Sequence, residues 1–530
     1  MDKTSSSLSS PFLSSSSVML ETAHTTPNTK LVLTKNGFLL TGLPDGEKPD
    51  GFEQTAAGFV CRSPVAAFPY AHIAQNRTEI AIRALKNVFV SSWSVSAKNS
   101  LKTHPRGFSY FPYQAAGIEF MKEHKRCLNA DEPGTGKTIQ VAGLINETNV
   151  QRVLILCPAS LRLNWGQELE KWVFRKLQHV EIISYDSAWR SRVFKELRDD
   201  NFDLVVMDEA HYLKNGDSKR SMAAQALAAQ ADRVVLLTGT PVMNRPKDLF
   251  IILRIINKNM FPDFQSFALR YCGAFLQTIR MRGREKKVWN NEGSSHEKEL
   301  GEILRSTIMI RRCKKDVLPQ LPHKLRQVIE VPSNLQSCKK EQEKWNQACS
   351  EVGYDQALRQ LENGVGVAFE KMASARQQVA IDKVPFVIEH VTNMLEGGKV
   401  VVFAHHRSVV DALMVGLQSY SPVRYVGGMT DKSKDESVRS FQDDEQCRVF
   451  IGNIQAAGVG ITLTAASTVV FAELGLVPSV MCQAEDRCCR IGATAESILV
   501  QHIVLNGSLD VKLARMLVKK QEVADMILDI

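Results

Sequence analysis

The segment DEPGTGKT, at residues 131–138, has the residue types of a phosphate-binding loop. Backbone amides of such a loop, at the N-terminus of a helix, can surround the β- and γ-phosphates of a nucleotide. Lys137 would add a point charge and Thr138 a hydroxyl for Mg²⁺. Asp131 stands where the usual spacing has its opening glycine, and Pro133 fixes φ in the turn. We predict cofactor contacts along the loop: Asp131, Glu132, Pro133, Gly134, Thr135, Gly136, Lys137 and Thr138.

A second segment, FDLVVMDEAH at 202–211, follows an apolar run with two carboxylates. A buried parallel strand with an acidic end is typical of nucleotide-binding α/β sheets, because ligands gather at the carboxyl ends of the strands. We predict that Asp208 binds Mg²⁺ and that Glu209 orients and deprotonates the attacking water. Together the two segments predict a protein that binds ATP with Mg²⁺ and hydrolyses it.

The composition restricts the class of protein. The chain has 530 residues, 44% of them hydrophobic and 23% charged, which fits a soluble globular protein of two or three domains. A net charge of +9 favours a polyanionic partner. The 11 cysteines form no C-x-x-C pair and no Cys/His cluster at zinc spacing, so we expect neither a disulfide framework nor a structural metal.

No apolar run reaches the roughly 18 residues that suggest a membrane span. We therefore expect no membrane association and an intracellular protein, in the nucleus of a eukaryote or the cytoplasm and nucleoid of a bacterium. The N-terminal tract SSSLSSPFLSSSS predicts a disordered tail. A cleavable organelle transit peptide is the alternative, although the first 60 residues contain no arginine.

Two series of strand-like runs must position these residues. Strands that alternate with helical stretches predict parallel sheets built from strand–helix–strand units, hence an α/β fold with two such domains. The first series lies at 152–158, 180–186, 204–211 and 233–241, and the second at 399–406, 423–428, 447–453 and 468–474. We predict a disordered tail at 1–30, a small accessory module at 31–95, a first ATP-binding domain at 100–325, a helical connector and protrusion at 326–380 and a second domain at 381–530.

Eight motifs occur in a specific order along residues 111–492. They are FPYQAAG, DEPGTGKT, CPASLRLNW, DEAH, LTGTPVMN, MIRRCKKDVLPQLPHK, NIQAAGVGITLTAAS and QAEDRCCRIG. In this order they resemble the motifs of the Swi/Snf-type DNA-translocase ATPases of helicase superfamily two, over about residues 105–510. Three features look closest to the HARP-type annealing helicases and their short microbial relatives: RCKKDVLPQLPHK, TGTP followed by RP, and QAAGVGITLTAAS.

The resemblance implies two RecA-like domains and further site residues. Gln114 would read the adenine edge. Arg487 and Arg490, three apart and thus on one face of a predicted helix, would approach the γ-phosphate from the second domain. Gly458 and Gly460 would line the same cleft. Cys489 and Ala493 replace the usual His and Gln, which bears on coupling between the domains.

The resemblance also implies contacts with DNA. A translocase grips the DNA backbone without reading sequence. The residues at the family's phosphate-contacting positions are Ser160, Asn164, Thr238, His405, Arg407 and Thr462. The basic run RMRGREKK, at 280–287, fits a nucleic-acid contact and a solvated surface equally well, whereas Arg311 and Arg312 favour ion pairs or domain packing.

The predicted function is an ATP-dependent translocase on duplex or branched DNA, for fork remodelling or strand annealing in repair or replication. ATP would close the two domains and hydrolysis would open them. The alternatives are a chromatin remodeller, a strand-separating helicase and a non-enzymatic DNA-binding scaffold.

Overall fold

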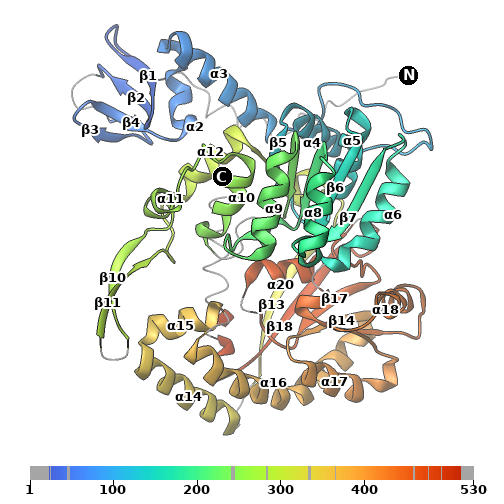
Figure 1. Ribbon diagram of the computed structural model, residues 1–530. Helices are drawn as coiled ribbons and strands as arrows, with labels where there is room; N and C mark the ends of the chain where they lie inside the picture. Colours follow the sequence, from blue (N-terminus) through green and yellow to red (C-terminus); the bar gives the residue numbers. More distant parts are fainter. Residues whose placement is uncertain are drawn as a thin grey trace, which may run out of the picture.

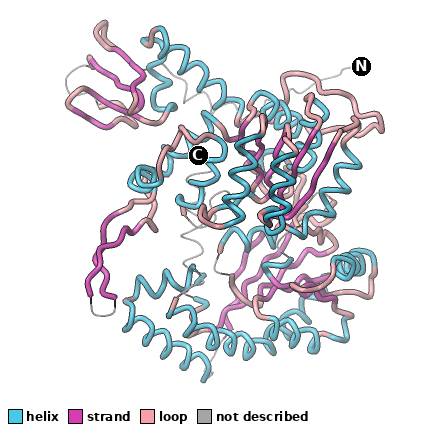
Figure 2. The backbone as a smooth tube through the Cα atoms, in the orientation of Figure 1, coloured by secondary structure: helices cyan, strands magenta, loops and turns pink. Residues whose placement is uncertain are grey.

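The computed structural model describes residues 23, 25–43, 48–239, 245–281, 284–331, 336–363, 366–457, 460–475, 477–490, 492–511 and 513–514. Most of the predicted tail at 1–30 lies outside these residues. The described strands form two six-stranded sheets, a four-stranded sheet and a two-stranded hairpin (Figure 1, Figure 2). Among the described helices, none is both long and apolar enough to cross a membrane.

The first six-stranded sheet is parallel throughout, in the order β12-β5-β9-β8-β6-β7. Its strands are rich in Val, Leu and Ile because helices cover both faces (Figure 1). The strands are β5 (Arg126–Asn129), β6 (Arg152–Cys157), β7 (His179–Ser184), β8 (Leu204–Asp208), β9 (Arg233–Leu237) and β12 (Met309–Ile310). Because β9 lies between β5 and β8, the loops that follow these three strands meet at one edge of the sheet.

Thirteen described helices belong to this first domain. They are α4 (Pro112–Glu123), α5 (Lys137–Glu147), η3 (Ala159–Leu161), α6 (Arg162–Trp172), α7 (Tyr185–Ala188), α8 (Ser191–Asp199), η4 (Ala210–Leu213), α9 (Lys219–Gln230), η5 (Pro246–Leu249), α10 (Phe250–Ile256), α11 (Phe264–Tyr271), α12 (Glu297–Thr307) and α13 (Lys314–Val317).

The second six-stranded sheet is also parallel, in the order β13-β18-β17-β14-β16-β15. Its strands are β13 (His323–Val331), β14 (Lys399–Ala404), β15 (Val423–Tyr425), β16 (Val449–Asn453), β17 (Ala466–Phe471) and β18 (Ser497–Leu505). The helices around it are α14 (Gln336–Val352), α15 (Tyr354–Asn363), α16 (Val367–Met394), η6 (Leu395–Gly397), α17 (Arg407–Gly416), η7 (Gln418–Tyr420), α18 (Asp431–Asp443), α19 (Ile454–Ala457) and α20 (Pro478–Glu485). The predicted fold class, with two parallel-sheet domains, is confirmed.

The predicted helical connector at 326–380 is wrong at its start. Residues from His323 to Val331 form β13, which pairs with β18 along its whole length. β13 lies at the edge of the sheet and is mostly exposed, so it lacks the continuous apolar run that identifies a buried strand. The helical part consists of α14, α15 and α16, and α16 continues past residue 380 to Met394.

The N-terminal part folds as a four-stranded antiparallel sheet, in the order β1-β2-β4-β3, with helices packed on it. Its elements are β1 (Lys30–Thr34), β2 (Gly37–Thr41), β3 (Glu53–Thr55), β4 (Gly58–Cys61), α2 (Pro64–Ala67), η2 (Phe68–Ile73) and α3 (Asn76–Ser91). This module is docked on the first domain: Ser63 donates to the Glu302 carboxylate of α12, and Glu53 pairs with Arg270 at 2.6 Å.

Candidate active site

The predicted phosphate loop connects β5 to α5, and α5 begins at Lys137. Gly134 and Gly136 have φ of 85° and 81°, in the left-handed region that favours glycine. A Cβ on Gly136 would also lie 2.4 Å from the Nε2 atom of Gln114, so the close packing leaves room only for glycine. The loop thus brings backbone amides to a helix N-terminus, the arrangement that binds phosphate groups.

The Lys137 side chain lies against this loop. Its Nζ donates to the carbonyl oxygens of Asp131 at 2.8 Å and Glu132 at 3.2 Å. Burial lowers the pKa of the Lys137 ammonium, and the negative charges of Glu209, Asp131 and Asp208 partly offset that effect. A cation is therefore held among carboxylates at the place where phosphate charge must be neutralised.

The Asp131 side chain points into the first domain, and its contact with the cofactor remains a prediction. It is fully buried, and its Oδ1 accepts from the Nε of Arg312 at 3.0 Å. Its Oδ2 accepts from the Nε2 of Gln140, also at 3.0 Å. A buried carboxylate needs such partners to offset its lost hydration, so the Asp131 side chain anchors the loop. The same ion pair confirms the structural role expected for Arg312.

Gln114 and Tyr113 brace the loop from the first turn of α4. Both are buried and both donate to the Thr135 carbonyl, at 3.2 and 2.9 Å respectively. Gln114 Oε1 also accepts from the backbone N–H of Phe111 at 3.1 Å. The side chain that the sequence analysis assigned to adenine therefore lies directly beside the loop, and its contact with the base remains a prediction.

Asp208 ends β8 at the same edge of the sheet. Its carboxylate accepts from Trp165 Nε1 at 2.8 Å and from the backbone N–H of Glu209 at 2.9 Å. Burial raises the pKa of Asp208, and the adjacent charge of Glu209 raises it further. A buried carboxylate with a raised pKa gains most from a cation, which suits a metal ligand.

Glu209 adopts a left-handed backbone conformation, with φ 49° and ψ 52°. Non-glycine residues rarely adopt it, and such strain concentrates at functional sites. Burial alone would raise the pKa of Glu209, but the hydrogen bond from His211 and the charges of Lys137 and Arg487 outweigh burial and lower it. Glu209 is therefore ionised at neutral pH, as a general base must be.

His211 connects Glu209 to the strand between β5 and β8. Its Nδ1 lies 3.2 Å from Glu209 Oε2 and 3.3 Å from the hydroxyl of Thr238, directly after β9. Thr238 is fully buried, and its contact with DNA remains a prediction. The Thr238 hydroxyl lies beside His211, because Thr238 directly follows β9 at the buried edge of the sheet.

Arg487 and Arg490 do not lie on a helix, so that prediction is wrong. α20 ends at Glu485, and the backbone hydrogen bonds tighten after Asp486. Asp486 still donates to the fourth residue before it, whereas Arg487 and Cys488 donate to the third. This tighter turn ends the helix and redirects the chain toward the first domain.

The two arginines nevertheless reach the phosphate loop. The Cγ of Arg490 lies 3.6 Å from the position that a Cβ on Gly134 would take. Arg487 is buried and donates through Nε to the Gln483 carbonyl at 2.9 Å. Both guanidinium groups lie within electrostatic range of Glu209. The structure therefore brings together residues from the two segments DEPGTGKT and QAEDRCCRIG.

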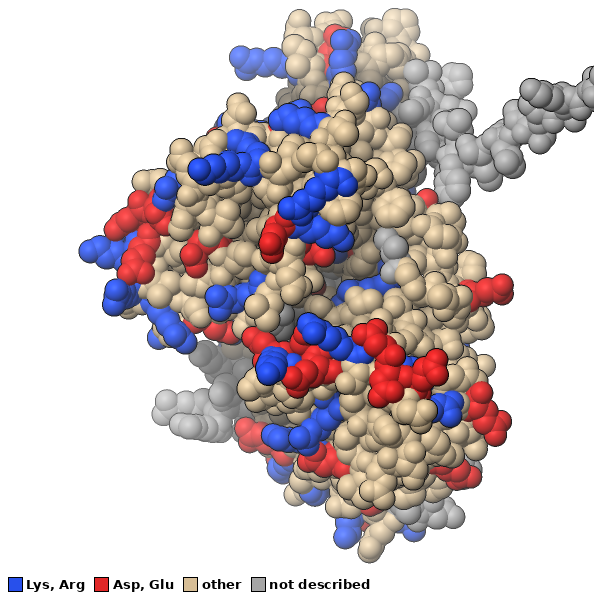
Figure 3. Space-filling model, turned by 90° about the vertical axis from the view of Figure 1, so that its right-hand side faces the viewer, with Lys and Arg blue, Asp and Glu red and all other residues tan. Residues whose placement is uncertain are grey.

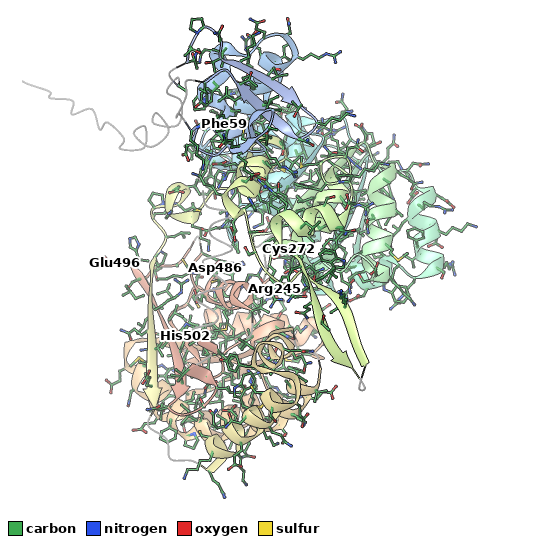
Figure 4. The ribbon with its side chains drawn as sticks, turned by 90° about the vertical axis from the view of Figure 1, so that its left-hand side faces the viewer. Phe59, Arg245, Cys272, Asp486, Glu496 and His502 are labelled. Carbon is green, nitrogen blue, oxygen red and sulfur yellow. The ribbon has the colours of Figure 1, made fainter. Side chains whose placement is uncertain are left out.

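A cluster of ion pairs where the domains meet was not predicted from the sequence. Lys314 joins the two domains, whereas Lys324 of β13 belongs to the same domain as Glu485 and Asp486. Lys314 of α13 pairs with Asp486 at 2.8 Å, and Lys324 of β13 pairs with the same carboxylate at 2.6 Å. Lys324 also pairs with Glu485 at 3.2 Å. We call Lys314, Lys324, Glu485 and Asp486 the seam cluster, and Figure 4 labels Asp486 where the two domains meet. All four residues lie within recognised motifs, but spacing along the chain gives no sign of their pairing.

The seam cluster is also joined to the phosphate loop. The backbone N–H of Lys314 donates to Glu132 Oε2, and Lys314 Nζ donates to the Cys489 carbonyl at 3.2 Å. The two lysines hold the pKa of Asp486 far below its usual range although burial opposes them. A single lysine thus connects the loop of one domain to the arginine segment of the other.

The remaining residues that were predicted to contact DNA differ in their exposure and in their hydrogen bonds. Asn164 on α6 is partly exposed and Arg407, the first residue of α17, is exposed. The backbone N–H of His405 donates to Glu473 at 2.8 Å, and its ring is partly buried. The hydroxyl of Thr462 accepts a hydrogen bond from Arg490 at 3.0 Å, and this bond helps to hold Arg490 beside the phosphate loop.

Three predicted residues can be placed only in part. Ser160 belongs to η3 by its backbone, and its side chain is not among the described features. Gly458 lies outside the described residues. Gly460 has φ of 81°, a conformation that favours glycine. It directly precedes Ile461, whose carbonyl oxygen accepts a hydrogen bond from Arg487.

The residues present fit ATP with Mg²⁺. The glycine loop and Lys137 offer phosphate ligands, and Asp208 with Thr138 offers the oxygen donors that Mg²⁺ prefers. The Nε atom of Arg490 is buried without a hydrogen-bond partner among the described residues, although it lies beside the loop. Such a donor is what a phosphate oxygen from a nucleotide would satisfy.

Comparison with known proteins places this site in a family. Residues 113–193 and 174–379 match the family model described as SNF2-related domain, and residues 382–492 match the one described as helicase conserved C-terminal domain. A curated relative from Homo sapiens, DNA annealing helicase and endonuclease ZRANB3, is 34% identical over 79% of this chain and 40% of its own length. The Bos taurus protein named SWI/SNF-related matrix-associated actin-dependent regulator of chromatin subfamily A-like protein 1 is 33% identical over 76% of this chain and 43% of its own length.

Among solved structures, the Sulfolobus solfataricus SWI2/SNF2 ATPase core in complex with dsDNA is 20% identical, with a TM-score of 0.38, over 82% of this chain and 95% of that chain. The two parallel-sheet domains with a site closed between them define a two-domain, helicase-like ATPase architecture. The chain belongs to the SNF2-related family, as the resemblance predicted. It spans less than half the length of the two curated relatives named above.

Proposed function

We propose that this protein is an ATP-dependent DNA translocase that couples ATP hydrolysis to movement along duplex or branched DNA, in fork remodelling or strand annealing. The observation that carries this proposal is the approach of Arg490 to Gly134: the Arg490 Cγ lies 3.6 Å from the position that a Cβ on Gly134 would take, where the two domains meet. A site completed only when two domains meet can convert hydrolysis into domain movement. The printed names of the relatives, which include an annealing helicase, support DNA as the partner.

The catalytic roles follow from the positions of the side chains. Lys137 neutralises phosphate charge, and Glu209 accepts a proton from the attacking water. Mg²⁺, when held by Asp208 and Thr138, supplies further charge neutralisation at the phosphates. Arg487 and Arg490 stabilise the charge of the transition state, a contribution of about 10³- to 10⁵-fold in phosphoryl-transfer enzymes.

Movement on DNA requires that each domain holds the backbone in turn. The exposed positions of Asn164 on the first domain and Arg407 on the second suit contacts with phosphate oxygens. Opening and closing of the seam would change the distance between these two contacts. Such contacts carry no base information, so the protein would act without sequence preference, in the compartment where the chromosome lies.

ATP turnover with and without duplex DNA tests the proposal. We expect duplex DNA to stimulate turnover, and Lys137→Ala or Arg490→Ala to abolish the stimulated rate. Turnover by Lys137→Ala at the wild-type rate would falsify the site assignment. Absence of stimulation by any DNA would point to the scaffold alternative.

The direction of the strand reaction needs a separate experiment. We expect the protein to rewind a bubbled duplex in an annealing assay and to displace no strand from a partial duplex. Displacement without rewinding would assign a strand-separating helicase instead. Movement of a nucleosome in a sliding assay, without rewinding, would assign a chromatin remodeller.

A further inference from the structure

A two-stranded hairpin projects from the first domain and is not used by the ATP site. It consists of β10 (Phe275–Met281) and β11 (Arg284–Asn290), between α11 and α12. Within the described residues these strands pair only with each other. Figure 1 and Figure 4 show the hairpin extending away from the body of the first domain, on the side of the helices α14 and α15. Both of its faces are therefore open to a partner.

One face of the hairpin carries an exposed aromatic and an exposed cation. The register places Leu276 opposite Trp289 and Thr278 opposite Lys287, so these four side chains share a face. Leu276 is 54% exposed and Trp289 46%, and Thr278 and Lys287 are also exposed. An apolar, aromatic surface of this kind on a free-standing hairpin is unusual without a partner.

The charge toward the hairpin tip has one predominant sign. The run 280–287 contains five basic residues and one acidic residue. The described strand positions among them include Arg280, Arg284 and Lys286. On the face of the molecule in Figure 3, in contrast, Lys and Arg are interspersed with Asp and Glu over both domains. The sequence toward the hairpin tip is thus predominantly basic, and Lys287 lies on the face that carries Trp289.

The root of the hairpin is firmly held. Glu292, two residues after β11, pairs with Arg245 and with Lys247 of η5. Asn290 Nδ2 donates across the root to Gln277 Oε1 at 2.9 Å. Figure 4 shows Arg245 and Cys272 near this root. The hairpin is therefore a positioned arm, fixed at its root to η5 of the first domain.

We propose that the face formed by Leu276, Thr278, Lys287 and Trp289 binds unpaired bases of DNA at a junction. Trp289 stacks on a base exposed where the strands part, while Lys287 meets the phosphates. Base stacking on an aromatic beside a positive groove is the general way in which single strands are held without sequence preference. In a duplex the base faces are covered by their neighbours, so the same surface discriminates branched from blunt DNA.

This inference rests on the proposed translocase function and adds the kind of DNA structure that is recognised. Fluorescence anisotropy with the full chain and labelled oligonucleotides tests it, using an oligothymidine single strand, a forked duplex and a blunt duplex. We expect Trp289→Ala to lower affinity for the single strand and the fork by roughly 10-fold relative to the blunt duplex. Trp289→Phe should retain most of the preference because it keeps an aromatic face.

Lys287→Ala should weaken single-strand binding and reduce its dependence on salt concentration. Phe386→Ala removes an exposed aromatic from α16, away from the hairpin, and should leave all three affinities at wild-type values. An unchanged ratio of fork to blunt-duplex affinity in Trp289→Ala overturns the proposal, and would leave the face to a protein partner. Failure of the translocase function is a separate result, namely wild-type turnover that no DNA stimulates.

Discussion

Glu209, which we propose as the general base, is shaped by its surroundings. Its backbone is held in the left-handed region, and its pKa is lowered by His211, Lys137 and Arg487 against the effect of burial. Replacement of the carboxylate by an amide keeps the shape and removes the base. We expect Glu209→Gln to lower DNA-stimulated ATP turnover by about 10²- to 10⁴-fold, the usual contribution of a general base.

The measurement is phosphate release at saturating ATP and duplex DNA, beside nucleotide binding by the same variant. Binding should persist, since Lys137 and the glycine loop are intact. Glu196→Gln, on the exposed face of α8, is the matched control and should turn over ATP like the wild type. A Glu209→Gln variant with more than a tenth of wild-type turnover would assign the base elsewhere.

At this scale the sequence was informative where the chemistry depends on residue type and spacing. Lys137, Asp208 and Glu209 could be identified because a phosphate loop and an acidic strand end have recognisable patterns, and the structure brings them together. The side-chain partners of Asp131 and Thr238 could not be predicted, because they depend on burial against residues distant in sequence. No local pattern shows that Asp131 faces Arg312 or that Thr238 faces His211.

At the scale of elements, α14 is joined to the end of the second domain by a buried carboxylate. Glu341 is 2% exposed and accepts from the backbone N–H of Leu509 at 2.8 Å. Burial, with the charge of Asp510, raises the pKa of Glu341 from an ordinary value of 4.5 to about 7. Between these two pH values the folded protein holds a proton that the unfolded chain has released, so the free energy of unfolding falls as pH rises.

We therefore expect Glu341→Gln to remove this pH dependence. Protonated Glu341 stabilises the wild type fully below pH 4.5, and this contribution of about 3 kcal/mol is lost above about pH 7. Urea unfolding of the full chain at pH 5 and pH 8 measures it: the variant should match the wild type at pH 5 and exceed it at pH 8. Glu343→Gln, exposed on the same helix, should follow the wild type at both values, and equal slopes for all three proteins would refute the assignment.

The elements that sequence could predict were the buried ones. β6, β8, β9, β14 and β16 are continuous apolar runs because helices cover both faces of their sheets. β13 and the β10–β11 hairpin were not recognised, because an edge strand and a free-standing hairpin keep polar and charged residues along their length. The turn after α20 was likewise missed, since its hydrogen-bond pattern and not its composition ends the helix.

On the scale of the whole molecule, two α/β domains meet at the seam cluster, where ions are buried together. Asp486 pairs with Lys314 from the first domain and with Lys324 from its own domain, so closure adds Lys314 to a pair that the second domain already holds. Breaking a buried pair on one side leaves the partner charge poorly compensated. The seam therefore favours the closed arrangement that brings Arg490 to Gly134.

This coupling can be tested at Lys314, because this residue contacts both the phosphate loop of the first domain and the arginine segment of the second. Its N–H meets Glu132 in the phosphate loop and its ammonium meets Asp486 and the Cys489 carbonyl. Lys314→Ala keeps the backbone contact and removes the ammonium, so closure should weaken while the loop persists. We expect ATP turnover to fall about 10-fold or more, and the radius of gyration measured by X-ray scattering with a non-hydrolysable nucleotide to increase toward an open form.

Lys315→Ala, the exposed neighbour on the same short helix, is the matched control and should close and turn over like the wild type. A Lys314→Ala protein that loses turnover but keeps the compact radius would show that Lys314 acts on the chemistry and not on closure. One that keeps both would show that the seam cluster is not needed to join the domains. The combination of lost turnover and an expanded radius is expected because the same ammonium holds the arginine segment against the phosphate loop.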